Sequence, residues 1–93
     1  MSGGSGFANA PLSVNVGAAS INVLPANPFR KGLIIVNVGT NYVFLGCEDP
    51  AIPNGGIALA QNGVWNMDPY SFFNGDVFAI SPSGTTIAIQ EFQ

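Results

Sequence analysis

Glycine and proline interrupt this chain so often that long helices are excluded. There are 12 glycines and 7 prolines among 93 residues, and in a helix interior glycine costs about 1 kcal/mol and proline about 3 kcal/mol relative to alanine. No window of the sequence combines apolar residues at helical spacing with capping residues at both ends. The segments between the interruptions are short and rich in Val, Ile, Leu and Phe, which is typical of strands. The sequence therefore predicts an all-β domain.

Eight short segments have the composition or the alternation of strands. Leu12, Val14 and Val16, for example, alternate with polar residues, as in a half-buried strand. The expected strands are residues 12–16, 21–23, 33–38, 42–45, 57–60, 64–68, 77–80 and 85–92. Turn residues separate them, and Asn62-Gly63 is a favoured pair in tight hairpins. We expect consecutive strands to form four hairpins in an antiparallel β-sandwich or a small jelly-roll-like barrel.

The N-terminal residues differ in composition from the rest. MSGGSG resembles a flexible linker, so we expect residues 1–10 to form a flexible N-terminal arm and residues 11–93 to form a single β-sandwich domain. A domain of this size buries only about 60 to 65% of the surface that its unfolded chain exposes. Support from a partner chain is therefore expected.

The charge of the chain argues against several classes of partner. Charged residues make up 8% of the sequence and the net charge is −3, whereas a nucleic-acid-binding protein needs a cluster of cations. No apolar run is long enough to cross a membrane, and the N-terminus lacks the features of a signal peptide. The single cysteine, Cys47, excludes an internal disulfide and fits synthesis in a reducing cytoplasm.

The sequence offers little for catalysis. It has no histidine, which removes the commonest general base and the commonest metal ligand, so we expect no enzymatic activity and no cofactor. Glu48-Asp49, or Asp68 together with Asn74 and Asp76, could supply oxygen ligands to Ca²⁺. Asp before Pro and Asn before Gly are also ordinary turn residues, and this second interpretation is favoured. We therefore predict no metal site.

Partner-binding residues are suggested by two apolar patterns. Residues 33–36 and 42–45 place bulky side chains on both faces of one expected hairpin, so the face outside the core needs a cover. A second protein surface is the simplest cover, and the chain's own second sheet, loops and arm are the alternative. Aromatic residues in the predicted 70–73 loop and nearby either close the end of the core or anchor an interface. The candidate partner-binding residues are Phe7, Val43, Phe44, Trp65, Tyr70, Phe72 and Phe73.

Six short motifs follow one another in a distinctive order between residues 21 and 93. They are Asn27-Pro28-x-Arg30, Leu33-Ile34-Ile35-x-Asn37-x-Gly39-x-Asn41, Gly56-Ile57-x-Leu59, Trp65-x-Met67-Asp68-Pro69, Gly75-x-Val77-x-Ala79-Ile80-Ser81 and Ile87-Ala88-Ile89-x-Glu91. In this order the chain resembles small β-sandwich structural proteins of tailed bacteriophage virions. The pattern consists of strands and turns and contains no catalytic signature.

The resemblance implies a structural role in a virion. Proteins of this kind are capsid decoration (cement) proteins or modules of head and tail fibres, and they commonly form trimers. The short chain favours a decoration protein that binds the major capsid protein at the capsid surface, as a homotrimer, after synthesis in the host cytoplasm. The alternative is a head or tail fibre module that binds a receptor or carbohydrate.

Overall fold

The computed structural model describes residues 8–67 and 73–93, which form eight strands. The strands are β1 (Leu12–Val16), β2 (Ile21–Leu24), β3 (Gly32–Asn37), β4 (Val43–Gly46), β5 (Ile57–Leu59), β6 (Val64–Asn66), β7 (Val77–Ile80) and β8 (Thr85–Phe92). The prediction of an all-β fold of about eight strands is confirmed, and each strand begins and ends within two residues of its predicted bounds. In this part of the chain no helix is long and apolar enough to span a membrane.

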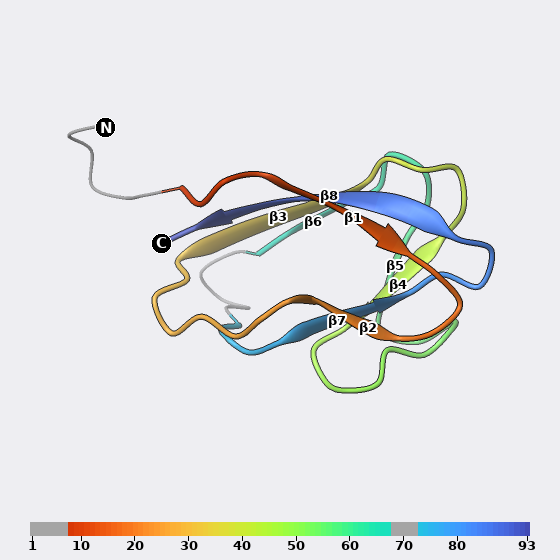
Figure 1. The fold of residues 1–93 in the computed structure, drawn as a ribbon, viewed down its shortest axis with the longest axis horizontal. Helices are drawn as coiled ribbons and strands as arrows, with labels where there is room; N and C mark the ends of the chain where they lie inside the picture. Colours follow the sequence, from red (N-terminus) through yellow and green to blue (C-terminus); the bar gives the residue numbers. More distant parts are fainter. Residues whose placement is uncertain (1–7, 68–72) are drawn as a thin grey trace.

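The strands form two antiparallel four-stranded sheets that face each other (Figure 1). One sheet, here called the β1 sheet, has the order β1-β8-β3-β6, and the other, the β2 sheet, has the order β2-β7-β4-β5. β1 pairs with β8, β2 with β7, β3 with β6, and β4 with β5. The chain is thus arranged like one long hairpin that reverses between β4 and β5 and wraps around a core. This is the jelly-roll arrangement.

This arrangement corrects the prediction of four hairpins. Strands consecutive in sequence lie in opposite sheets at the predicted turns 17–20, 39–41, 61–63 and 81–84. Asn62 does adopt the left-handed conformation expected of Asn-Gly, with φ at 65°, yet it connects β5 of one sheet to β6 of the other. Turn residues determine where the backbone reverses, whereas pairing depends on which strand faces can bury apolar surface together.

The core lies between the two sheets. Its buried members are Val16, Val23, Leu24, Leu33, Ile35, Val43, Leu45, Leu59, Met67, Val77, Ala79, Ile87 and Ile89. Trp65 and Phe73 are partly buried and pack against this cluster, so both help to close the core. Val43 is fully buried and offers no surface to a partner, which corrects its selection as a partner-binding residue.

The outer face of the β2 sheet is covered by the chain's own β4–β5 loop, residues 47–56. Phe44 and Ile80 point outward from this sheet and are buried together with Ala51 of the loop, and Phe78 packs against them. Gly56, at φ 70°, allows the loop to return close to β4, because a Cβ there would meet the carbonyl oxygen of Leu45. Phe44 is therefore covered within the chain, not by the second protein surface that we expected.

Pairing along β8 begins before β1. Ala8 forms a β-bridge with Phe92, and the Asn9 backbone N–H donates to the carbonyl oxygen of Glu91 at 3.0 Å. The Gln90 side-chain amide in turn donates to the carbonyl oxygen of Asn9 at 2.7 Å. Residues 8 and 9, which we assigned to the flexible arm, are thus attached to the last strand of the domain.

Candidate functional site

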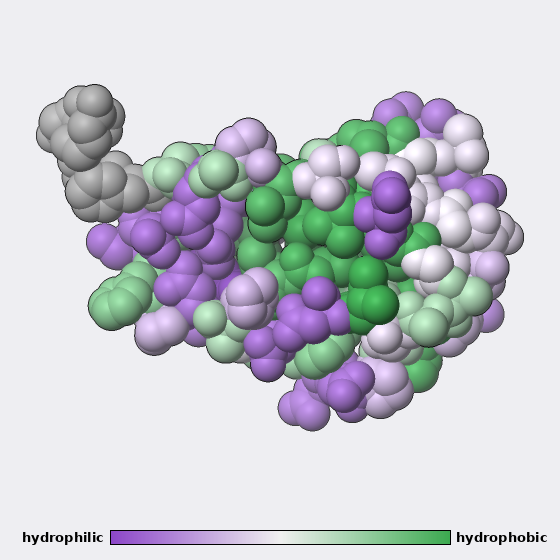
Figure 2. All heavy atoms as spheres, viewed as in Figure 1, coloured by the Kyte–Doolittle hydropathy of each residue, from purple (hydrophilic) through white to green (hydrophobic). Residues whose placement is uncertain are grey.

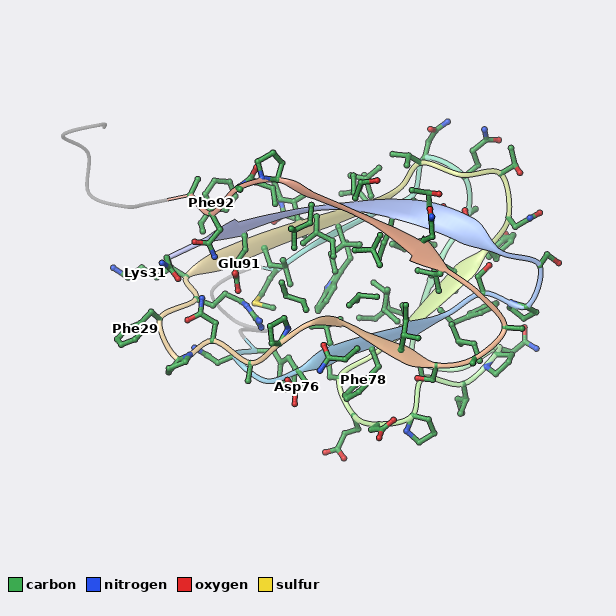
Figure 3. All side chains as sticks on the ribbon, viewed as in Figure 1. Phe29, Lys31, Asp76, Phe78, Glu91 and Phe92 are labelled. Atoms are coloured by element: carbon green, nitrogen blue, oxygen red, sulfur yellow. The ribbon has the colours of Figure 1, made fainter. Side chains whose placement is uncertain are left out.

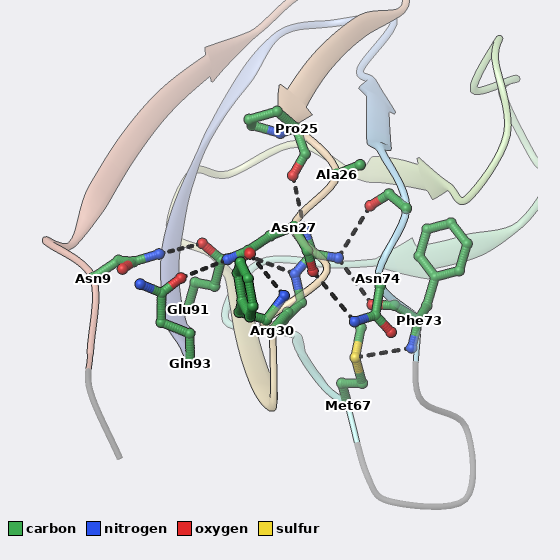
Figure 4. Close-up of polar contacts among 12 residues, drawn as sticks. Asn9, Pro25, Ala26, Asn27, Arg30, Met67, Phe73, Asn74, Glu91 and Gln93 are labelled. Atoms are coloured by element: carbon green, nitrogen blue, oxygen red, sulfur yellow. Dashed lines mark hydrogen bonds and ion pairs between the residues drawn. The ribbon is translucent and has the colours of Figure 1, made fainter.

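Arg30 forms a buried polar cluster at the end of the molecule that holds the C-terminus (Figure 4). Its Nε donates to Glu91 Oε2 at 2.7 Å. Its terminal nitrogens donate to the carbonyl oxygens of Pro25, Phe73 and Gly75 at 2.8, 2.9 and 3.0 Å. Only 1% of the surface of Arg30 is exposed. The guanidinium is therefore shielded from water, and these hydrogen-bond partners offset the cost of burying its charge. The cluster joins the β2–β3 connection, the segment before β7 and the end of β8.

Two neighbouring side chains extend this cluster. The Asp76 carboxylate accepts a hydrogen bond from the Ala26 backbone N–H at 2.8 Å. The Asn74 amide donates to the carbonyl oxygens of Asn27 and Pro28, each at 3.2 Å. Both side chains therefore attach the β2–β3 connection to the segment before β7, which agrees with a turn role. Asp68, the third proposed calcium ligand, lies outside the described residues, and within those residues no three His, Cys, Asp or Glu side chains gather as a metal site.

Asn37 forms a second buried polar cluster at the other end of β3. Its amide nitrogen donates to the carbonyl oxygens of Asn41 and Leu59 at 2.7 and 2.9 Å. Its Oδ1 accepts from the Gly39 backbone N–H and the Thr85 hydroxyl at 3.1 and 2.8 Å. All four hydrogen-bonding positions of the amide are therefore used. The cluster fixes the β3–β4 loop, residues 38–42, relative to β5 and β8.

The same end of the molecule is tied by two further contacts. The Ser81 hydroxyl donates to the carbonyl oxygen of Tyr42 at 2.7 Å. The Asn41 amide donates to the carbonyl oxygens of Ser83 and Gly84 at 3.2 and 2.8 Å. The β3–β4 loop is thereby attached to the β7–β8 turn, residues 81–84, which fixes the backbone of Tyr42.

A hollow of about 630 Å³ lies beside this tied end. Tyr42, Phe44 and Ala58 line it from the β2 sheet side, and Asn41, Asn54 and Ser83 line it from three loops. The ring planes of Tyr42 and Phe44 lie within 17° of each other, with centroids 6.1 Å apart. Tyr42 is 57% exposed, and none of the residues that line the hollow is charged. The hollow is a candidate ligand site.

The outer face of the β1 sheet is a second candidate site. Because Ile35, Ile87 and Ile89 face the core, residues next to them in each strand face outward. The outward set is Ser13, Asn15, Ile34, Val36, Val64, Asn66, Thr86, Ala88, Gln90 and Phe92. None of these side chains is charged, and Val64 is 55% exposed. We call this set the β1 face.

Polar and apolar side chains are unevenly distributed over the surface of the domain. Figure 2 shows apolar side chains along the side where the edge strands β1 and β2 lie, with polar residues toward the end that holds the C-terminus. Leu12 and Ile21 are exposed on these strands. Figure 3 shows Phe29, Lys31, Glu91 and Phe92 at that polar end, where the Lys31 backbone N–H donates to the carbonyl oxygen of Phe92 at 2.8 Å. Exposed apolar side chains therefore occur both on the edge strands, at Leu12 and Ile21, and at the polar end, at Phe29.

The predicted partner-binding residues are not brought together. Val43 belongs to the main core, Phe44 to the cluster under the β4–β5 loop, and Trp65 and Phe73 to the rim of the main core. Phe7, Tyr70 and Phe72 lie outside the described residues. The sequence analysis did not select Tyr42 or Val64 as partner-binding residues. The available signal was their position, because each is an aromatic or β-branched residue directly after a predicted turn.

The Cys47 thiol is half-buried. Burial raises the pKa of this thiol above its ordinary value, and the positive charge of Arg30 lowers it by a smaller amount. The thiol is therefore protonated at neutral pH, which makes it a weak nucleophile.

Comparisons with protein-family models, curated proteins and solved structures found no match for the chain. The resemblance to virion proteins therefore depends on the sequence pattern alone.

Proposed function

We propose that the protein is a virion structural protein: a capsid decoration (cement) protein that binds the major capsid protein and stabilises the shell. The observation that carries this proposal is the uncharged β1 face, with Val64 exposed at its edge strand. The centre of a protein–protein interface is depleted in charged residues, and such a face suits burial against another subunit. The jelly-roll arrangement agrees with this role, since viral capsid domains use it, although the fold alone does not determine function.

The construction of the domain also supports a structural role. Both ends of the sandwich are held by buried side chains, Arg30 at one end and Asn37 at the other. Ala8 and Asn9 are paired with the last strand, so the N-terminal side of the domain is attached to β8. A domain whose ends are fixed by buried contacts suits a structural role. We further propose that it acts as a homotrimer, because closed symmetry buries the same surface in each copy.

The β1 face can be tested by placing a charge on it. Val64→Asp introduces a carboxylate at an exposed position, so the domain should remain folded, with a melting temperature within a few degrees of the wild type. We expect it to lose most of its binding to capsids that lack the protein, measured by co-sedimentation. Phe29→Asp changes an exposed apolar residue at the polar end and should bind normally. Equal binding by Val64→Asp and the wild type would exclude the β1 face as the docking surface.

A further inference from the structure

We infer that the hollow beside Tyr42 binds a neutral carbohydrate, with one sugar ring stacked on the Tyr42 side chain. Its volume of about 630 Å³ lies within the range of roughly 300 to 1,000 Å³ of small-molecule sites. This inference concerns a different surface from the β1 face, because Phe44 and Ala58 point outward from the β2 sheet. It is therefore independent of the proposed binding to capsid protein.

The walls of the hollow are held in place before any ligand arrives. Asn41 is fixed by hydrogen bonds to the β7–β8 turn, and the Tyr42 backbone is fixed by Ser81. The floor is the buried ring of Phe44, which packs against Ile80 and Ala51. A site that is largely pre-formed loses little conformational entropy when a ligand binds. This property favours recognition of a small, weakly held ligand such as a sugar.

The absence of charge in the lining selects the class of ligand. A phosphate, a sialic acid or an acidic peptide would lose part of its hydration in the hollow without gaining an ion pair. Thr40, Asn54 and Ser83 present amide and hydroxyl groups that both donate and accept hydrogen bonds. The Asn41 amide nitrogen is used by the β7–β8 turn, so Asn41 contributes its acceptor oxygen. Sugar hydroxyls also donate and accept, so the lining is complementary to a neutral polyol.

Tyr42 supplies the apolar part of the interaction. One face of a pyranose ring carries mostly C–H groups, whose slight positive charge favours the negative face of an aromatic ring. Tyr42 is more than half exposed at the rim, and Phe44 lies nearly parallel to it as the floor. A proline-rich peptide can also pack on aromatic side chains. The sugar is favoured because the lining has four amide or hydroxyl side chains around two aromatic rings.

The test is an NMR titration of the full 93-residue chain. The probes are lactose, maltotriose and chitotriose as neutral sugars, 3′-sialyllactose as a charged sugar, and a deca-proline peptide. We expect at least one neutral sugar to shift backbone amides of residues 40–44, 53–58 and 83–84 in a saturable manner at millimolar concentration. Sialyllactose should bind more weakly than lactose. Shifts caused by the peptide alone, shifts elsewhere, or no shift with any neutral sugar would each overturn the inference.

Three variants separate stacking from general effects on the fold. Tyr42→Ala should weaken sugar binding by at least about tenfold, because the stacking ring is lost. Tyr42→Phe keeps the ring and should bind within about threefold of the wild type. Phe29→Ala removes an exposed aromatic residue far from the hollow and should leave the affinity unchanged. If Tyr42→Ala binds as well as Phe29→Ala, with both variants folded by melting temperature, the assignment of Tyr42 is wrong.

Discussion

Arg30 and Glu91 are 61 positions apart in sequence, yet their ion pair joins the β2–β3 connection to the end of β8, and the other hydrogen bonds of Arg30 add the segment before β7. The position of Glu91 contained a usable signal. It follows Ile87 and Ile89 at a spacing of two, so its carboxylate faces the core side of β8, where a buried cation is required. Both residues belong to the pattern that resembles virion proteins, as do Asn37 and Ser81 of the other end. That pattern therefore marks buried polar clusters, not a binding surface.

Arg30→Met should destabilise the domain by about 3 to 5 kcal/mol, because Glu91 would be left buried without its cation. The measurement is urea unfolding followed by circular dichroism. Lys31→Met is the matched control, since Lys31 is exposed, and it should change the unfolding free energy by less than about 0.5 kcal/mol. Equal effects of the two substitutions would mean that the buried ion pair does not stabilise the fold.

Cys47 should react slowly with alkylating reagents. Burial raises the pKa of the thiol, so as pH increases the unfolded chain loses this proton before the folded chain does. Folding stability should therefore fall as pH rises from the ordinary pKa of cysteine to the raised one. Iodoacetamide alkylation, followed by mass spectrometry, should show its rate midpoint at a higher pH in the folded chain than in the chain unfolded in urea. A midpoint at the same or a lower pH would contradict the assigned environment.

At the scale of elements, strand positions could be predicted and strand partners could not. Alternating side chains and turn residues are local, so all eight strands were located from them. Pairing of β1 with β8 joins Leu12 to Ile89 across almost the whole chain, and no local signal specifies it. The cover over Phe44 was missed for a similar reason. Its partner Ala51 lies in an irregular loop whose path depends on the finished sheet.

Phe44→Ala should cost about 3 kcal/mol, at the lower end of the range for buried phenylalanine, because the cluster under the β4–β5 loop is small. It should also make residues 47–56 more sensitive to proteolysis, since the loop loses its main apolar contact. Thermal melting and limited proteolysis with mass spectrometry measure the two effects. Phe29→Ala, which changes an exposed aromatic residue outside both core clusters, is the control and should show neither. Unchanged cleavage of the loop in Phe44→Ala would show that Phe44 does not hold it.

At the scale of the whole molecule, uncharged surface should dominate the attachment. With few charged residues available, the proposed docking on a capsid would depend on apolar contact and backbone hydrogen bonding. In about 1 M NaCl the screening length falls to about 3 Å, which removes most of the attraction between surface charges. We expect occupancy on virions, measured by gel densitometry after washing, to survive this salt concentration. Release of the protein from virions by salt alone would show that attraction between charged residues holds it there.

The number of copies per virion distinguishes a decoration protein from a fibre or tail module. A decoration protein repeats over the capsid lattice, whereas a fibre or tail module is present at a few sites. Quantitative mass spectrometry of purified virions, with the major capsid protein as internal standard, gives this number. We predict a copy number comparable to that of the major capsid protein, on the order of hundreds, as expected for a subunit that follows closed, repeated symmetry. A few copies per virion would contradict it and would favour the fibre module.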